Sequence, residues 1–317
     1  MSTASYNCPC CCGGPLKFSG ESGKLECTAC GNNYEPEALE MMTPEESIDE
    51  ITFANDAKRF DTGEAGMRAY FCKNCGAELM ADETAAAECP YCGSPTILPD
   101  RIEGGVKPEK VIPFVVTKEQ AQKQFEDYFK GKKLLPNVFL NSRNRISEMR
   151  RLYIPYWLFS CDACADMVYD AEKVRTEQKG EWEITRTKHY LVRRKGGMRF
   201  ENIPVDGSVK MDDKLTESLE PYDLSAAIPF QSAVLAGAMA DHADADCDAC
   251  EKRAVERSVE QTMLDTVRDY DTVSERSRRI IAERGSATPA LLPVWLMTTV
   301  KEGKTYTFAV NGQTGKL

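Results

Sequence analysis

The stretch that decides the organisation of this chain is YFCKNCGAELMADETAAAECPYCGSPTILP, residues 70–99. It contains two Cys-x-x-Cys pairs separated by 13 residues, and glycine follows each pair directly. A Cys-x-x-Cys turn presents two sulfurs to one ion, and zinc prefers four thiolates in a tetrahedron. Glycine after the second cysteine permits the positive φ that is common in such a turn. The spacing predicts a zinc ribbon with four ligands: Cys72, Cys75, Cys89 and Cys92.

Residues 1–35 repeat this pattern as Cys8-x2-Cys11-x15-Cys27-x2-Cys30. The segment NCPCCCGGPL also contains Cys10 and Cys12, to which the pattern gives no role. All ligands of both ribbons come from the protein, so no coordination position is open and the zinc is expected to be structural. Each ribbon is too short to bury a core alone, so zinc should supply much of its folding free energy. Two Zn²⁺ ions are therefore expected; the alternative for the first segment is that one pair is free thiol.

The tetrapeptide CDAC occurs twice, at Cys161–Cys164 and at Cys247–Cys250. Together the two pairs supply four thiolates, which is a full set for a third zinc ion if the sulfurs come within about 4 Å of one another. A regular strand would instead turn Cys161 and Cys164 to opposite faces. Cys247 and Cys250 could lie in the first turn of a helix, where the helix dipole lowers the pKa of a thiol. A lowered pKa suits metal binding and a redox pair equally. Three interpretations stay open: a third zinc site, redox-active pairs or a disulfide, and unpaired thiols.

The bulk composition narrows the function classes. The 317 residues carry a formal net charge of −10, 14 cysteines and two histidines, His189 and His242. The acidic balance disfavours binding by phosphate neutralisation. Scarce histidine, and the lack of a Gly-rich phosphate loop, HExxH or GxSxG, favour a protein that is not an enzyme. Neither a signal peptide nor a run of about 18 apolar residues occurs, which favours a reducing, cytoplasmic location where cysteines act as thiolate ligands.

Composition divides the chain into four regions, and we expect an α+β fold. These are a first zinc ribbon (1–35), an acidic linker (36–69), a second zinc ribbon (70–99) and a mixed domain with an antiparallel sheet and a few helices (100–317). A turn of helix is expected in the linker after Thr43. Residues 117–131 predict a helix that Thr117 and Gln120 cap reciprocally. The apolar spacing of residues 250–270 predicts a longer helix.

Further segments carry a resemblance to a known group of proteins. Besides residues 70–99 they are VIPFVVTKEQAQKQFEDYFKGKKLLP, YIPYWLF, FENIPVDGSVKMDDKLTESLEPYDLS, LAGAMAD and LLPVWLMTTVKEGKTYTFAVNGQTGK. The chain resembles bacterial TFIIB-type zinc-ribbon proteins, which are often labelled as related to the primosomal helicase. Because the sequence has no Walker-type loop, it rejects a helicase motor.

The resemblance implies a zinc-ribbon module at the inner face of the cell membrane that acts as an adaptor in envelope-stress assemblies. Members are usually followed by a hydrophobic segment that anchors them, and some are encoded beside phage-shock proteins and SPFH-domain scaffold proteins, which are therefore the expected partners. This chain stops at Leu317, so we expect that the anchor has been removed or that this member lacks it. The family commonly has Asp, Ala and Val at the CDAC positions, so the resemblance says nothing about these cysteines.

The sequence thus predicts a non-enzymatic zinc-binding scaffold that mediates protein–protein contacts. Nucleic-acid binding by the ribbons is the first alternative, and it requires basic and aromatic residues around the cysteine turns. The second ribbon is instead acidic, with Glu78, Asp82, Glu83 and Glu88 against Lys73, so we do not expect nucleic acid as a partner. A thiol-redox protein that uses the CDAC pairs is the second alternative, and it requires an exposed cysteine of low pKa.

Overall fold

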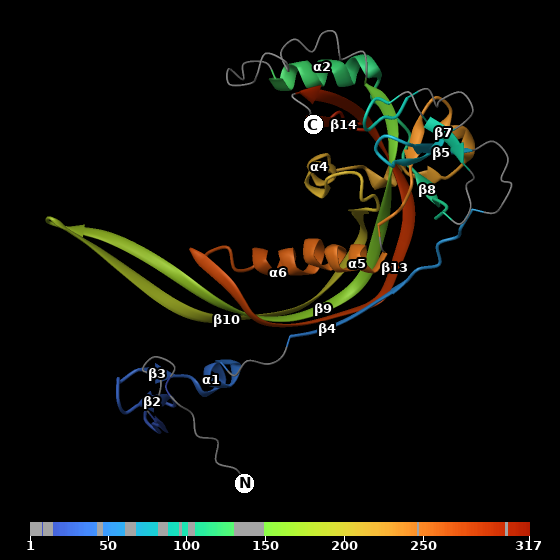
Figure 1. Cartoon of the computed structure of the whole chain (residues 1–317). Helices are drawn as coiled ribbons and strands as arrows, with labels where there is room; N and C mark the ends of the chain where they lie inside the picture. Colours follow the sequence, from blue (N-terminus) through green and yellow to red (C-terminus); the bar gives the residue numbers. More distant parts are fainter. Residues whose placement is uncertain are drawn as a thin grey trace. The chain divides into compact units, whose positions relative to one another are not determined.

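The computed structural model describes residues 8, 15–42, 47–60, 68–81, 88–94, 97–100, 105–129, 149–245, 247–301 and 304–317. The protein is a mixed α+β structure with mostly sheet and few helices (Figure 1), which confirms the predicted class. It divides into two compact units. The first consists of residues 1–51, 162–198 and 259–282, and the second of residues 52–161, 199–258 and 283–317.

The long strands β9, β10 and β13 contribute residues to both units. The strands are β1 Leu16–Phe18, β2 Leu25–Cys27, β3 Asn33–Tyr34, β4 Ile48–Ala54, β5 Arg68–Cys72, β6 Glu78–Ala81, β7 Ile97–Asp100, β8 Lys110–Val111, β9 Arg150–Lys179, β10 Trp182–Asp206, β11 Ile228–Pro229, β12 Met239–Asp241, β13 Thr272–Lys301 and β14 Lys304–Asn311. The helices are α1 Pro36–Met42, α2 Lys118–Phe129, α4 Asp213–Ser218, α5 Cys247–Val255 and α6 Gln261–Asp265. Within the described residues, none of these helices has the length and apolar character needed to cross a bilayer.

The sheet of the second unit is mixed. β5 pairs antiparallel with β6 and β7, β6 with β12, β8 with β11, and β13 with β14. These pairs confirm the expected antiparallel arrangement. Two parallel pairs were not expected: β12 lies parallel to β9, with Met239 opposite Leu152, and β8 lies parallel to β13, with Ala290 opposite Lys110. The parallel pairs join segments that are far apart in the sequence.

The centre of this sheet is buried on both faces. Residues 152–159 of β9 and 289–297 of β13 are buried without interruption. A strand covered on both faces reads as a continuous apolar run instead of an alternating one. This explains the sequences LYIPYWLF and PALLPVWLM at these positions.

Helix α2 forms where the sequence predicts it. The Thr117 N–H donates to Gln120 Oε1 (2.8 Å) and the Gln120 N–H donates to Thr117 Oγ1 (3.3 Å), which is a reciprocal cap. The apolar stripe of the helix buries Phe125, whose ring meets Phe308 edge to face with a centroid distance of 5.3 Å. Trp295 of β13 belongs to the same buried cluster.

The long helix expected over residues 250–270 is interrupted. It begins at Cys247 as α5, continues through a π-helical turn at Glu256–Glu260 and ends as α6 at Asp265. A shorter helix, α4, is capped by Asp212, whose carboxylate accepts hydrogen bonds from the N–H groups of Lys214 and Leu215.

The acidic segment 36–69, predicted as a linker, contains regular structure. It contains α1 and β4, and β4 pairs with β13. Within the second unit, Phe53 of β4 meets Phe159 edge to face at 5.2 Å. Phe53, one of the few apolar residues of this acidic stretch, therefore packs against β9 while β4 pairs with β13. The helical turn expected after Thr43 begins in residues 43–46, which lie outside the described residues.

In the first unit, charged side chains link neighbouring strands. Arg193 of β10 makes a two-pronged ion pair with Asp166 of β9, with both distances 2.7 Å. Arg276 of β13 does the same with Asp170 of β9 at 2.8 and 3.0 Å. Residues 15–34 form a separate three-stranded sheet in the order β1-β2-β3.

Candidate metal centre

Three cysteine turns share one backbone geometry. The turns begin at Cys27, Cys72 and Cys89. In each turn the N–H of the first cysteine donates to the carbonyl five residues later, and its carbonyl accepts from the glycine N–H four residues later, over 2.8 to 2.9 Å. Gly31, Gly76 and Gly93 have φ of 73°, 71° and 71°. Only glycine adopts this region without strain, which explains its place after each pair.

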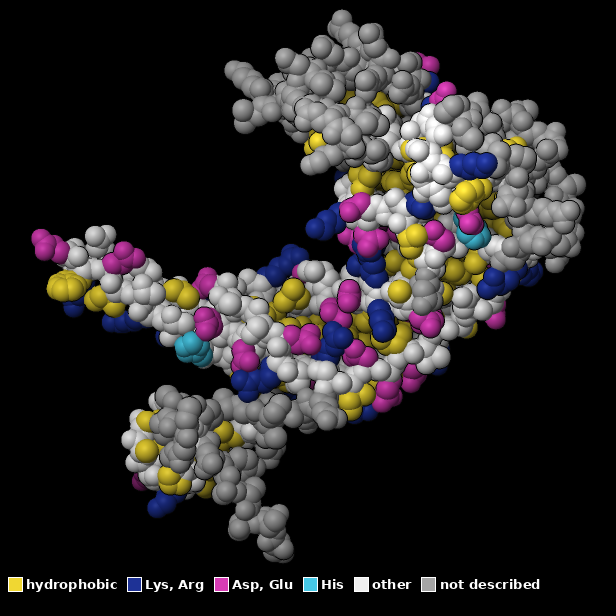
Figure 2. All heavy atoms as spheres, viewed as in Figure 1, with side chains coloured by type: hydrophobic (Ala, Val, Ile, Leu, Met, Phe, Trp, Pro, Cys, Tyr) yellow, Lys and Arg dark blue, Asp and Glu magenta, His cyan; other side chains and the backbone are white. Residues whose placement is uncertain are grey.

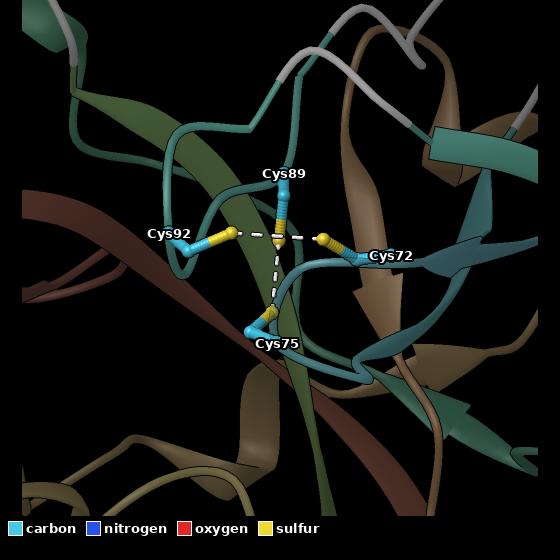
Figure 3. Close-up of side chains that lie close together, drawn as sticks. All are labelled: Cys72, Cys75, Cys89 and Cys92. Atoms are coloured by element: carbon cyan, nitrogen blue, oxygen red, sulfur yellow. Dashed lines mark hydrogen bonds between the residues drawn. The ribbon is translucent and has the colours of Figure 1, made fainter.

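Two of these turns bring four sulfurs together (Figure 3). Cys72 ends β5 and Cys75 lies three residues beyond it, and the side chains of all four cysteines point toward one another in Figure 3. The Sγ atoms lie 3.6 Å apart for Cys72 and Cys92, and 3.6 Å apart for Cys75 and Cys89. All four lie within 4.8 Å of one another, as a shared metal ion requires. The predicted grouping of these cysteines is therefore present in the structure.

Burial and hydrogen bonding shift the pKa values of these cysteines in opposite directions. Burial raises the pKa of Cys75 to about 11 and raises the pKa of Cys89 further above its usual range. Burial also acts on Cys92, but hydrogen bonds from the Asn74 side chain and the Ser94 backbone outweigh it and lower the pKa of Cys92 to about 7. Without a bound cation Cys75 and Cys89 are therefore neutral thiols near pH 7. A metal ion would supply the positive charge that holds all four as thiolates.

The sheet holds both turns in place through backbone carbonyls. Arg150 at the start of β9 donates to the Cys89 carbonyl (2.6 Å) and pairs with Glu88. Lys210 Nζ donates to the Cys75 carbonyl at 3.1 Å. Thr298 of β13 donates to the Pro90 carbonyl at 2.8 Å. The cysteine turns are thus fixed from three directions.

A buried hydrogen-bond network adds a fourth anchor. The Tyr91 hydroxyl donates to the Asp241 carboxylate, which also accepts from the Ser208 hydroxyl (2.5 Å) and the His242 N–H (3.0 Å). Burial raises the pKa of Asp241 to about 6, although the hydroxyl donors favour its charged form. Burial also raises the pKa of nearby Asp206 to about 7. Tyr91 therefore ties the second cysteine turn to β12.

The second ribbon is part of a large core. Cys72, Leu79 and Cys89 are buried in one cluster with Leu152 of β9 and Leu292 of β13. The segment over which the sequence predicts the second zinc ribbon, residues 70–99, is therefore built into the sheet.

 The strand pairings that place residues 70–99 in the sheet, such as Met80 opposite Ala240, join residues about 160 positions apart in the chain.

Arg150, Tyr91 and Asp241 were missed by the sequence analysis. The spacing of the cysteines identifies only the ligands. The residues that hold the cysteine turns in place lie at no fixed interval from the cysteines, so no pattern reveals them. Asp241 lies in LAGAMAD, one of the segments that carry the family resemblance, but the segment alone does not indicate what the carboxylate binds.

The first cysteine group is described in part. The sulfurs of Cys8, Cys27 and Cys30 lie within 4.8 Å of one another, with Cys8 and Cys30 at 3.5 Å. The Tyr34 hydroxyl lies 3.3 Å from the Cys8 sulfur. Three of the four predicted ligands therefore form a group that could hold a metal ion. Cys11, the fourth, lies outside the described residues, as do Cys10 and Cys12.

The CDAC pairs form no such group. Among the described residues, two groups of side chains could hold a metal, and neither contains Cys161, Cys164, Cys247 or Cys250. The physical reason lies partly in β9, because residues three apart on a strand point to opposite faces. Cys161 is buried and Cys164 is exposed. The interpretation of the two pairs as one zinc site therefore loses its geometric basis.

The second CDAC pair lies in the first turn of α5, as expected for Cys247 and Cys250. Burial, and then the neighbouring Cys247, raise the pKa of Cys250 to about 12. The Cys250 sulfur contacts the Asp206 carbonyl at 3.5 Å. A redox-active cysteine needs a lowered pKa and access to solvent. Cys250 has the opposite properties, so it would not serve as the attacking thiolate of a redox pair.

Comparison with known proteins gives one informative relative. No family model matches the chain, and no solved structure matches it. The chain is 35% identical over 316 residues to the Bacillus subtilis (strain 168) protein named "Uncharacterized protein YdjG". The match covers 99% of this chain and 88% of that relative. An identity of this size over nearly the whole length means that the chain belongs to the same family as YdjG.

Proposed function

We propose that this protein is a zinc-stabilised adaptor that holds protein partners together at a membrane. The observation that carries the proposal is the closed group of four thiols at Cys72, Cys75, Cys89 and Cys92, built into the central sheet. An ion held by four protein thiolates has no open position for a substrate, so its role is to fix the fold. We propose that the protein acts through the surfaces that this metal stabilises.

Zinc is the ion that fits this donor set best. A tetrahedron with Zn–S bonds of about 2.3 Å places its sulfurs about 3.8 Å apart. Within the group formed by Cys72, Cys75, Cys89 and Cys92 (the Cys72 group), two Sγ separations are 3.6 Å, which is close to this spacing. We propose the same ion for the first group, with Cys11 as the fourth ligand beside Cys8, Cys27 and Cys30.

The partners and the membrane attachment in this proposal rest on the resemblance to TFIIB-type zinc-ribbon proteins. We propose a phage-shock or SPFH-domain scaffold as the partner on that basis. Nucleic acid is a weaker candidate. On the face drawn in Figure 2, Lys and Arg side chains alternate with Asp and Glu side chains. Such a mixed surface gives no support for affinity through phosphate neutralisation.

Native mass spectrometry of the protein isolated gently from its own host tests the proposal. We expect two zinc ions per chain and the added mass of at least one partner protein. Substitution of Cys72 and Cys75 by serine should remove one zinc and weaken partner retention. A chain isolated without metal would overturn the structural role. So would a metal ion with an open coordination position that binds added small molecules. Retention of single-stranded DNA in place of protein would favour nucleic-acid binding.

A further inference from the structure

A cavity in the second unit lies beside the Cys89 turn. Its volume is about 360 Å³, and its charged lining residues are Glu88, Lys118, Arg150 and Arg151. Met239 and Trp295 provide apolar parts of its wall. Ligand sites in proteins typically combine an apolar wall with a few placed polar groups, in volumes from about 300 Å³ upward. The cavity has this character and plays no part in holding the metal directly.

Arg151 is held in place by aromatic rings. Its guanidinium carbon lies 5.2 Å from the ring centroid of Phe114 and 5.5 Å from that of Trp295. The two rings themselves meet edge to face at 5.4 Å. Ring contact fixes the guanidinium group but accepts few of its hydrogen bonds, since an aromatic face has no lone pair. In the part of the chain that the structure describes, no carboxylate forms an ion pair with Arg151.

The other charges in the cavity leave a positive balance. Arg150 and Glu88 pair with each other, and Arg150 also donates to the Cys89 carbonyl. Their charges therefore cancel within the wall. The lining also includes Lys118 and Arg151, so the formal charge of the lining side chains is positive. This local excess stands out in a chain whose net charge is −10.

We propose that this cavity binds an acidic segment of a protein partner, with a carboxylate on Arg151 and a neighbouring apolar side chain against Trp295 and Met239. A guanidinium group matches a carboxylate through two parallel hydrogen bonds, and prior fixation of the arginine reduces the entropy lost on binding. This inference rests on the proposed adaptor function and names the surface that performs it.

The cavity is also joined to the metal centre. Glu88 and Arg150 belong to its wall, and Arg150 holds the Cys89 turn by its carbonyl. Loss of the metal would release this turn and with it the Glu88–Arg150 pair. Binding of the acidic segment therefore depends on the metal, although the metal never contacts the ligand.

The first experiment measures fluorescence anisotropy of a labelled peptide, Glu-Leu-Glu-Leu-Glu, with the metal-loaded full chain. The matched probe has glutamine at each glutamate. We expect the acidic peptide to bind and the glutamine peptide to bind at least about tenfold more weakly, because truncated charge pairs at binding hot spots cost this much or more. Arg151→Ala should weaken binding of the acidic peptide by about tenfold or more, and Arg151→Glu should abolish it.

The control variant is Arg199→Ala, which removes an exposed arginine of the same unit. Its affinity should stay within about twofold of the natural chain, since an exposed charge away from the site contributes little. Metal content and the midpoint of thermal unfolding are measured for each variant, so that a folding defect is recognised. Equal binding by Arg151→Ala, equal binding of both peptides, or no saturable binding below about 1 mM would overturn the proposal.

A second measurement separates this proposal from the adaptor function. The Arg151→Glu variant is isolated from the host and analysed for its partner. Loss of the partner with both metals retained supports the cavity as the docking site. Undiminished partner retention means that the adaptor function stands and the cavity proposal is wrong.

Discussion

Acidification should strip the metal from the Cys72 group far more steeply than it would from a site with one titrating ligand. Metal binding requires thiolates, so every proton held by the empty group must leave. At pH 7 Cys75 and Cys89 are protonated, since burial raises the pKa of Cys75 to about 11 and that of Cys89 further. Cys92, with a pKa of about 7, is about half protonated. These three ligands release about 2.5 protons per metal at pH 7.

The size of the effect follows from this count. With about 2.5 protons released, the apparent affinity falls about 300-fold for each unit by which the pH is lowered near 7. As the pH falls below 7 Cys92 becomes increasingly protonated, so the dependence on these three ligands rises toward about 1,000-fold per unit, and above pH 7 it falls toward about 100-fold.

Competition with a coloured chelator from pH 6 to 8 measures this dependence. The first group is disabled by substituting Cys27 and Cys30 with serine, so that one site is observed. Additional substitution of Cys75 should remove the remaining metal and serves as the control. A dependence of less than about tenfold per pH unit would refute the reasoning, because it would mean that one proton or fewer is released.

Four further predictions concern other parts of the molecule. Phe125→Ala should lower the free energy of unfolding by about 3–5 kcal/mol in a denaturant titration, because Phe125 is buried between α2 and the sheet. Asp206 has a pKa raised by burial to about 7, so its contribution to stability is complete below about pH 4 and is lost as the pH rises through about 7. The Asp206→Asn variant should therefore show a smaller fall in stability between pH 5 and 8, and an equal fall would contradict this. In the native protein a maleimide should label Cys164, which is exposed, well before Cys250, which is buried, as peptide mass mapping would show. Metal removal should abolish hydrogen-exchange protection of residues 15–34, where Cys27 is the one buried residue, while the centre of β9 stays protected.

The features that the sequence predicts correctly are local ones. Each cysteine turn is closed by hydrogen bonds that span five residues, and its glycine is required by the backbone of that same turn. The cap of α2 likewise depends on Thr117 and Gln120, three positions apart. Such features need no knowledge of the rest of the fold, so spacing alone identifies them.

The features that could not be predicted depend on distant residues. Tyr91 and Asp241 lie 150 positions apart, and β12, which presents Asp241, is only three residues long. A strand this short has no alternation that a sequence pattern could reveal. The CDAC pairs are a different case, because identical tetrapeptides lie on a strand and on a helix. A spacing of three brings two cysteines to one face of a helix and to opposite faces of a strand, so the motif has no meaning until its local structure is known.

The two metal groups differ in what the metal has to stabilise. In residues 15–34 the strands are two or three residues long, and within that range Cys27 alone is buried. A sheet of this size cannot offset the entropy of ordering its chain, so a bound ion would have to supply the stability. The Cys72 group instead shares a core with Leu152 and Leu292 of long strands that have apolar contacts of their own. Its ion is therefore not needed to form the sheet. A bound ion would instead fix the position of the Cys89 turn and, through Arg150, the wall of the cavity beside it.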